Sequence, residues 1–190
     1  FNTQDNVLLT ASTASGKTEA AFFPILTEFW ENPPASVGAL YIGPLKALIN
    51  DQFVRLNDLC EEADIPVWHW HGDVSQSHKA KLIKKPSGIL QITPESLEAL
   101  LIHKHMAIPR MFCDLRYVVI DEVHSLMRGD RGGQTLCLIE RLSRMACNME
   151  CHTEFHGRGD TLPLIAEYIK HHYPTMRCSF TEMAHWNEMP

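Results

Sequence analysis

The chain has 190 residues, of which 45% are hydrophobic and 21% are charged, and its formal net charge is −6 at pH 7. This length suits one domain, or one domain with a small extension, and the apolar content is sufficient for a buried core. No apolar stretch is long enough to cross a bilayer and no leader is recognisable, so we expect a cytoplasmic protein, or a nucleoid-associated one if bacterial, without a membrane partner. The negative charge excludes a broad basic footprint for nucleic acid, so any nucleic-acid contact is expected to be local.

Strand-like and helix-like segments alternate from residue 6 to residue 121. We expect strands at residues 6–10, 37–42, 66–70, 88–93 and 116–121, and helices at about 17–31, 45–63, 75–84, 94–104 and 132–146. This alternation predicts an α/β domain with a parallel sheet covered by helices on both faces. In such sheets, ligands bind beyond the carboxyl ends of the strands.

A small-residue turn lies between the first expected strand and the first expected helix. Residues 11–18 read Ala-Ser-Thr-Ala-Ser-Gly-Lys-Thr, and the candidate nucleotide-binding residues are Ser12, Thr13, Ala14, Ser15, Gly16, Lys17 and Thr18. Backbone N–H groups of such a turn and of the following helix start surround phosphates, while a lysine reaches the terminal ones. We therefore expect a nucleoside triphosphate here, with Lys17 on its phosphates and Thr18 on Mg²⁺.

A pair of carboxylates follows the strand expected at residues 116–121. The sequence there is Asp121-Glu122-Val123-His124. At the end of a strand, one carboxylate can hold the Mg²⁺ shell and the other can orient and deprotonate an attacking water. The two motifs together indicate nucleoside triphosphate hydrolysis.

Two further helix starts follow expected strands. The first contains Pro44, Leu45 and Lys46, and the second contains Thr93, Pro94, Glu95 and Ser96. Unpaired N–H groups at two such ends can hold successive phosphates of one nucleic-acid strand without reading its bases. Helix capping by Thr93 is the alternative explanation for the second start.

These segments resemble, in order, motifs I, Ia, Ib and II of superfamily 2 helicases, over roughly residues 5–144. Residues 16–22 and 93–101, and Arg131-Gly132 with residues 138–142 behind it, look most like the large helicase-related subgroup. The resemblance implies a three-layer RecA-like P-loop NTPase domain, the first motor domain of an ATP-dependent helicase or translocase. It also implies that Asp121 binds Mg²⁺, that Glu122 is the general base, that His124 couples nucleotide state to the partner domain and that Arg131 lies near nucleic acid.

The resemblance implies two partners, a nucleic acid, with DNA favoured over RNA, and a second RecA-like domain from the rest of the polypeptide. Arginines of that second domain would neutralise charge on the transferred phosphoryl group, so we expect the isolated chain to be almost inactive. A degenerate ATP-binding module within a larger assembly is the rival interpretation. It draws on Ser12 and Ala14, which stand where related families usually carry proline and glycine.

The pattern changes after residue 145. We expect a motor domain over residues 1–146, and a C-terminal extension or a remnant of downstream sequence over residues 147–190, because no Ser-Ala-Thr-like motif on a sixth strand is evident. Cys147, Cys151, His152 and His156 have tolerable zinc spacing. A closed zinc site normally draws its ligands from two separated pairs, so we predict no stoichiometric metal in this segment.

Overall fold

The computed structural model describes residues 6–10, 16–126, 130–146, 152–157 and 178–182. The strands are β1 (Asn6–Thr10), β2 (Val37–Ile42), β3 (Val67–Trp70), β4 (Gly88–Ile92), β5 (Tyr117–Ile120), β6 (His152–Gly157) and β7 (Cys178–Glu182). The helices are α1 (Lys17–Glu31), α2 (Lys46–Glu61), α3 (Gln76–Lys84), α4 (Pro94–His103), η1 (His105–Ala107), α5 (Ile108–Met111), α6 (Val123–Leu126) and α7 (Asp130–Met145).

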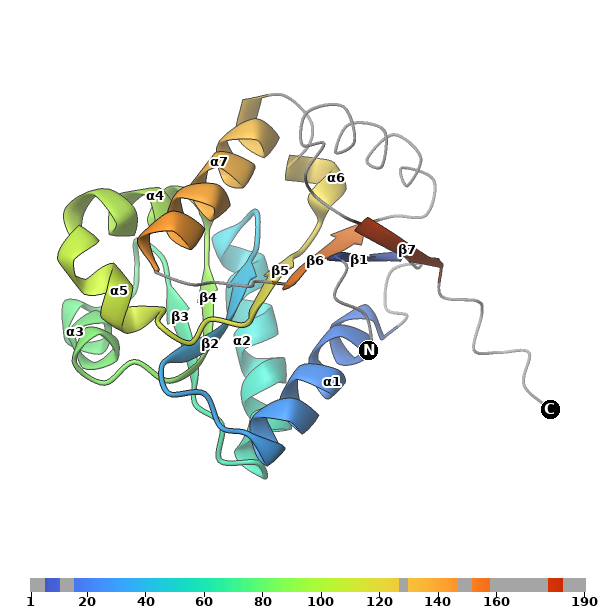
Figure 1. The fold of residues 1–190 in the computed structure, drawn as a ribbon, viewed down its shortest axis with the longest axis horizontal. Helices are drawn as coiled ribbons and strands as arrows, with labels where there is room; N and C mark the ends of the chain where they lie inside the picture. Colours follow the sequence, from blue (N-terminus) through green and yellow to red (C-terminus); the bar gives the residue numbers. More distant parts are fainter. Residues whose placement is uncertain (1–5, 11–15, 127–129, 147–151, 158–177, 183–190) are drawn as a thin grey trace.

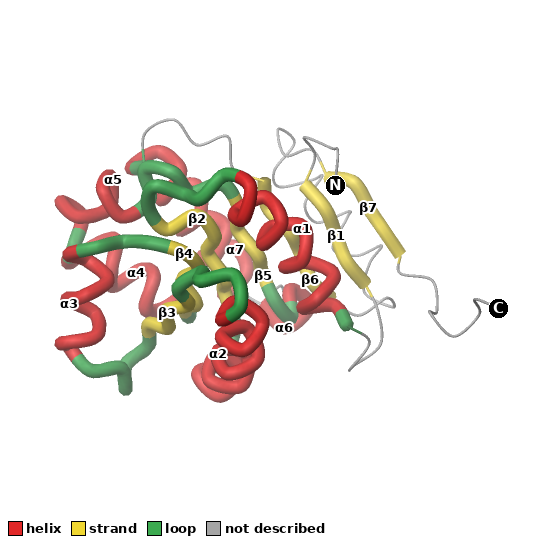
Figure 2. Tube along the Cα trace, turned by 90° about the horizontal axis from the view of Figure 1, so that it is seen from below, coloured by secondary structure: helices red, strands yellow, loops and turns green. Residues whose placement is uncertain are grey.

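The described strands form one parallel sheet in the order β3-β4-β2-β5-β6-β1-β7. Figures 1 and 2 show β3 towards one side of the molecule and β7, next to β1, at the other. All strands run in the same direction, so their carboxyl ends share one edge of the sheet. The α/β architecture predicted from the alternating pattern is confirmed.

Helices cover both faces of this sheet. One core cluster joins α1 and α2 to strand residues such as Ala39, Tyr41 and Val119. The other joins α3, α4, α5 and α7 to the alternate strand residues, such as Leu40 and Val118. Because successive side chains of a strand point to opposite faces, a strand buried on both sides reads as a continuous apolar run, as β2 does.

The helix starts and tight turns have local causes in the sequence. Thr93 caps α4, since its side chain accepts a hydrogen bond from the Ser96 amide, and Ser75 caps α3 in the same way through the His78 amide. Gly88 begins β4 with φ +66°, and a Cβ there would lie 2.0 Å from the carbonyl oxygen of Pro66. The turn before β4 therefore requires glycine, and it places the end of α3 beside the beginning of β3.

The predicted elements from residue 6 to residue 145 agree with the structure within about two residues. The short helices η1, α5 and α6 were not predicted, because a single turn has too few residues to show a periodic pattern. Among the described residues, no helix combines the length and the apolar character that crossing a membrane would demand.

Two strands were missed after residue 146. Strand β6 lies between β5 and β1, and β7 pairs with β1. The expectation that the sheet pattern stops near residue 145 is wrong for these strands. The sequence of β6, His-Thr-Glu-Phe-His-Gly, is mostly polar, so it lacks the apolar run expected of an interior parallel strand. The division of the chain at residue 146 stays a prediction.

Candidate nucleotide-binding and catalytic site

Backbone hydrogen bonds bring three of the predicted motifs to one edge of the sheet. The Asp121 amide donates to the Ile42 carbonyl at 2.9 Å, and the Gly43 amide donates to the Ile92 carbonyl at 3.1 Å. The segments that begin after β2, β4 and β5 therefore leave the sheet side by side. This places the acidic motif next to the two helix starts that were predicted to contact nucleic acid.

Strand β6 sets the distance between the two nucleotide motifs. Leu8 of β1 and Ile120 of β5 are both in register with Phe155 of β6, so β5 ends at the level of Leu8 and β1 continues two residues further, to Thr10. Neighbouring strands are about 4.8 Å apart, so β1 and β5 are separated by roughly 10 Å. A phosphate chain bound beyond β1 would thus have the carboxylates beyond β5 within reach of its metal shell.

The start of α1 has the geometry of a phosphate-loop exit. Gly16 has φ +81°, a left-handed conformation that favours glycine, and its carbonyl accepts the first helical hydrogen bond from Ala20 at 2.9 Å. Lys17 and Thr18 form the first turn of α1, where free backbone N–H groups and the helix dipole favour anions. Ser12, Thr13, Ala14 and Ser15 lie outside the described residues, so their predicted role remains a prediction.

The Thr18 hydroxyl is linked to α2. Thr18 is buried, and its Oγ1 donates to Gln52 Oε1 at 3.3 Å. A second polar contact joins the same two helices, since Arg55 Nε donates to Glu19 Oε1 at 2.7 Å. Helix α2 begins at the predicted nucleic-acid segment, so α1, which begins with the predicted Lys17 and Thr18, is connected directly to that helix.

The Asp121 carboxylate is held on both of its oxygens. The Tyr41 hydroxyl donates to Oδ2, and the Glu122 amide donates to Oδ1 at 2.8 Å. Tyr41 is fully buried on the neighbouring strand β2. Burial, with the nearby Asp121 carboxylate, raises the pKa of Tyr41 well above its usual value, so the phenol stays protonated and remains a donor.

Glu122 has an unusual backbone conformation. Its φ is +50°, in the left-handed region that non-glycine residues rarely occupy. This conformation follows directly on Asp121 and directs the chain into the short helix α6. Glu122 Oε2 lies 3.1 Å from His124 Nε2, and both side chains are partly accessible. The predicted general base therefore contacts the predicted coupling residue.

The oxygen donors at this edge fit Mg²⁺. Mg²⁺ in nucleotide sites usually takes one or two protein oxygens and completes its shell with phosphate oxygens and water. The Thr18 hydroxyl and the Asp121 carboxylate are oxygen donors of this kind.

Within the described part of the chain, no cluster of three or more His, Cys, Asp or Glu side chains suits a metal ion. The predicted absence of metal at Cys147, Cys151, His152 and His156 concerns side chains outside that part and stays a prediction.

The predicted nucleic-acid residues differ in exposure. Leu45, Lys46 and Glu95 are exposed, whereas Ser96 and Arg131 are half-buried. Pro44, Thr93 and Pro94 are buried, and their predicted contact with nucleic acid stays a prediction. The capping explanation for Thr93 is confirmed by its bond to the Ser96 amide at 3.3 Å, and the same hydroxyl donates to Ser96 Oγ at 3.0 Å.

Arg131 connects the two helix starts. Its guanidinium donates to the Pro44 carbonyl at 2.8 Å and, through Nε, to Glu95 Oε1 at 2.9 Å. Lys46 Nζ lies 3.1 Å from the Asp73 carboxylate, next to Gly72. One arginine from α7 thus fixes the spacing of the starts of α2 and α4.

Sequence reasoning missed Tyr41 and Gln52. Tyr41 lies inside an apolar strand and reads as core, which it also is. Gln52 is one polar residue on an amphipathic helix. The sequence gives no signal that either side chain contacts a nucleotide-motif residue, because both contacts depend on how distant segments pack.

Comparisons with known proteins identify the family of the chain. Residues 1–155 match the family model for DEAD/DEAH box helicases. The chain is 34% identical over 156 residues to the ATP-dependent helicase Lhr-Core of Methanothermobacter thermautotrophicus, covering 74% of this chain and 18% of that protein.

Two solved structures have similar folds. The DUF1998 helicase MrfA bound to DNA superposes with a TM-score of 0.81 at 26% identity, over 94% of this chain and 25% of that one. Mycobacterium smegmatis helicase Lhr bound to single-stranded DNA and AMP-PNP gives 0.78 at 25% identity, over 95% and 24%. The chain thus spans about a quarter or less of these proteins. It belongs to the DEAD/DEAH box helicase family and has the fold of its RecA-like motor domain.

Proposed function

We propose that this chain is the first motor domain of a superfamily 2 helicase or translocase that couples Mg²⁺-ATP hydrolysis to movement on DNA. The main support for the proposal is that the start of α1 and the Asp121–Glu122 pair lie at the same edge of the sheet. They follow strands that are about two strand spacings apart. The left-handed backbone of Glu122 at that edge is a further sign of a functional position.

In this proposal, the start of α1 and the preceding loop, from Ser12 to Thr18, bind the phosphates. Lys17 neutralises the terminal phosphates, and Thr18 with Asp121 would hold Mg²⁺, which when bound screens the phosphate charge that develops during hydrolysis. Tyr41 keeps the Asp121 carboxylate in one orientation. Glu122 orients and deprotonates the attacking water, and His124 transmits the state of that carboxylate to the partner domain.

Nucleic acid would lie over the starts of α2 and α4. There Leu45, Lys46, Glu95, Ser96 and Arg131 reach the surface at least in part, and two helix N-termini offer backbone donors to phosphates. We favour DNA over RNA because the MrfA and Lhr structures that this chain resembles were solved with DNA. A cytoplasmic or nucleoid location follows from that role.

The remaining parts of the site would come from elsewhere in a longer polypeptide. The chain corresponds to only 18% of its Lhr-Core relative, so a second RecA-like domain would supply the arginines that complete the ATP site. We therefore expect the 190-residue chain alone to bind nucleotide weakly and to hydrolyse it at a negligible rate.

The test is ATP turnover by the complete polypeptide, with and without single-stranded DNA, beside the isolated chain. Turnover that needs both the complete polypeptide and DNA would support the proposal. Nucleotide binding without stimulated hydrolysis would favour the rival interpretation, a degenerate ATP-binding module. Robust turnover by the isolated monomer would contradict the need for a second domain.

A further inference from the structure

Basic residues are concentrated in one part of this acidic chain. Six of its 17 Lys and Arg residues occur between residues 79 and 110, where Glu95 and Glu98 are the only acidic residues. Both glutamates belong to the first half of α4 and contact α7, where Glu95 pairs with Arg131 and Glu98 accepts from Gln134. The two glutamates therefore contact α7 and not the six cations.

These six cations form the surface that we call the α3–α5 basic face. Its members are Lys79, Lys81, Lys84, Lys85, Lys104 and Arg110. Arg110 of α5 donates to the carbonyl of Ile83 in α3, so the two helices are adjacent. Lys79 is half-buried with its ammonium 5.6 Å from the centre of the Trp70 ring, and the other five are exposed.

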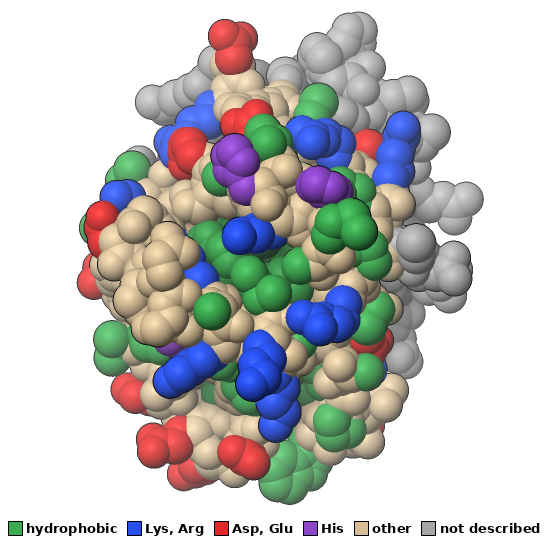
Figure 3. Space-filling model, turned by 90° about the vertical axis from the view of Figure 1, so that its left-hand side faces the viewer, with side chains coloured by type: hydrophobic (Ala, Val, Ile, Leu, Met, Phe, Trp, Pro, Cys, Tyr) green, Lys and Arg blue, Asp and Glu red, His purple; other side chains and the backbone are tan. Residues whose placement is uncertain are grey.

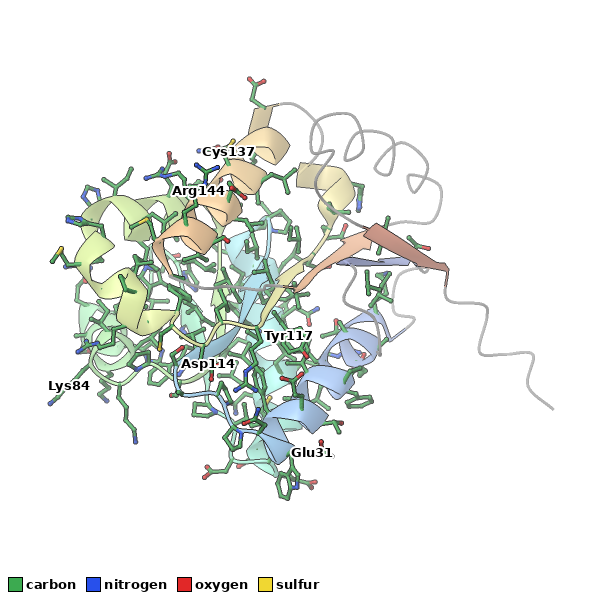
Figure 4. The ribbon with its side chains drawn as sticks, viewed as in Figure 1. Glu31, Lys84, Asp114, Tyr117, Cys137 and Arg144 are labelled. Carbon is green, nitrogen blue, oxygen red and sulfur yellow. The ribbon has the colours of Figure 1, made fainter. Side chains whose placement is uncertain are left out.

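The figures place this face on one side of the molecule. Figure 3, which views the side formed by α3, α4 and α5, shows several Lys and Arg side chains around an area of hydrophobic side chains. In Figure 4, Lys84 points outward beyond α3, away from α1 and the strands. The turn from Lys85 to Gly88 packs on Pro66, at the beginning of β3, so this part of the face lies at the opposite end of the sheet from Asp121.

The six cations also differ in their pairing. Elsewhere, Lys46, Arg55, Arg116, Arg131 and Arg144 each form an ion pair with a carboxylate. No carboxylate of the described residues forms an ion pair with any of the six. Lys81 and Lys84 gain some stabilisation from the carboxyl end of α3, but the helix dipole does not account for the lack of carboxylates around Lys85, Lys104 and Arg110.

From these observations we propose that the α3–α5 basic face binds the phosphate backbone of nucleic acid, as a second contact separate from the starts of α2 and α4. Lysines and arginines that no carboxylate neutralises raise the local potential and release counterions when they meet phosphates. Such contacts position a strand without reading its sequence. The inference rests on the proposed function, and it adds a strand segment beyond the one held by the helix starts.

An acidic protein segment is the competing occupant. Ile102 and Met106, which flank Lys104, are 50% and 84% exposed and would suit a protein surface. Phosphate is favoured because five of the six cations are solvent-exposed and none of the six pairs with a carboxylate of the described residues. Binding measurements with DNA and with an acidic peptide distinguish these two occupants.

The experiment uses the complete polypeptide with Lys84→Gln and Lys104→Gln combined. The matched control combines Arg141→Gln with Arg144→Gln, two exposed cations on α7. Binding is measured over a range of salt concentrations with single strands of about 10 and about 40 nucleotides, since one binding module covers on the order of 10 nucleotides. Stimulation of ATP turnover by the short strand reports only on the proposed contact at the starts of α2 and α4.

We expect the Lys84/Lys104 variant to bind the long strand about tenfold more weakly at low salt, with a log–log salt slope reduced by about 1.4. Stimulation by the short strand should equal that of wild type, and the α7 control should match wild type throughout. Long-strand binding equal to that of the control would overturn the inference and leave the proposed function intact. Equal losses of affinity for the short and the long DNA strand would also overturn the inference. The α3–α5 basic face would then be part of the contact at the starts of α2 and α4.

Two further outcomes are informative. If the variant keeps long-strand affinity but loses binding to a polyglutamate peptide that wild type binds, the occupant is an acidic protein and the inference is wrong. If wild type shows no DNA-stimulated turnover, the proposed function fails. The long-strand measurement then still decides whether the face binds phosphate.

Discussion

The two ends of the sheet use polar residues in different ways. At the amino end, the Asp114 carboxylate accepts from Arg116 at 2.8 and 3.0 Å and from the Ala35 amide at 2.7 Å, and the Asp114 amide donates to Ser36 Oγ at 2.9 Å. Arg116 also reaches Glu28 and the Asn32 carbonyl. Figure 4 labels Asp114 and Tyr117 near the beginning of β5. These groups join the end of α1 to the beginnings of β2 and β5.

At the carboxyl end of the sheet, the hydrogen bonding of the described residues is less complete. Glu122 adopts a left-handed backbone, and His124 Nδ1 is buried without a hydrogen-bond partner among the described residues. Networks whose members all have partners stabilise a fold, whereas strained or unpartnered groups persist where a ligand or a partner domain completes them. The amino end thus holds the domain together, whereas the carboxyl end keeps groups that the proposed function assigns to a ligand or a partner domain.

The largest expected effect is that of Glu122→Gln on turnover. Replacing the proposed general base by its amide should lower DNA-stimulated ATP hydrolysis about a hundredfold or more while Mg²⁺-ATP still binds. Phosphate release by the complete polypeptide is the measurement, with Glu140→Gln on the exposed face of α7 as the control. Undiminished hydrolysis would mean that another residue is the base.

Removing the Lys17 ammonium should come next in size. Lys17→Ala should weaken ATP binding more than tenfold, because a charge-assisted contact to the terminal phosphates is lost. Titration of a fluorescent nucleotide without nucleic acid measures this, and Lys84→Ala provides a lysine control far from the site. Equal affinities of Lys17→Ala and wild type would exclude the phosphate-loop assignment.

Tyr41→Phe tests the support of Asp121. The change keeps the buried ring but removes the donor to Oδ2, so the Mg²⁺ concentration needed for half-maximal turnover should rise by about tenfold. Phe22, which packs near the same ring, offers a control that leaves the hydroxyl in place, as Phe22→Leu. An unchanged or lower Mg²⁺ requirement in Tyr41→Phe would contradict a supporting role for the hydroxyl.

Substitutions at the amino end of the sheet should change the free energy of unfolding and not the rate of ATP turnover. Hydrogen bonds from Arg116 lower the pKa of Asp114, so its stabilising contribution is present above the pKa of an unfolded aspartate and is lost as the pH falls through the folded pKa. Asp114→Asn should cost about 1 kcal/mol at neutral pH and much less in acid, once the pH has fallen below the folded pKa of Asp114. Denaturant unfolding at both pH values measures this, and a cost that grows in acid would have the wrong sign.

The sequence predicted most of the fold because strands such as β2 are apolar throughout and the helices between them are bounded by turn residues and caps. It missed β6, whose polar residues pair through their backbone, and backbone pairing leaves no side-chain pattern. The sequence could nominate Lys17, Thr18, Asp121 and Glu122 as candidate site residues because nucleotide motifs are contiguous, and their roles stay predictions. It could not predict Tyr41 or Gln52, since each meets its partner only after segments 34 or 80 residues apart have packed together.

The most direct test of the difference between the two ends is DNA-stimulated ATP turnover per folded molecule, measured on the complete polypeptide as wild type, Glu122→Gln and Asp114→Asn. We expect Glu122→Gln to lose about a hundredfold or more of the wild-type rate with unchanged stability. We expect Asp114→Asn to keep the wild-type rate and to lose stability. A normal rate in Glu122→Gln, or a comparable loss of rate in fully folded Asp114→Asn, would show that the two ends of the sheet do not differ in this way.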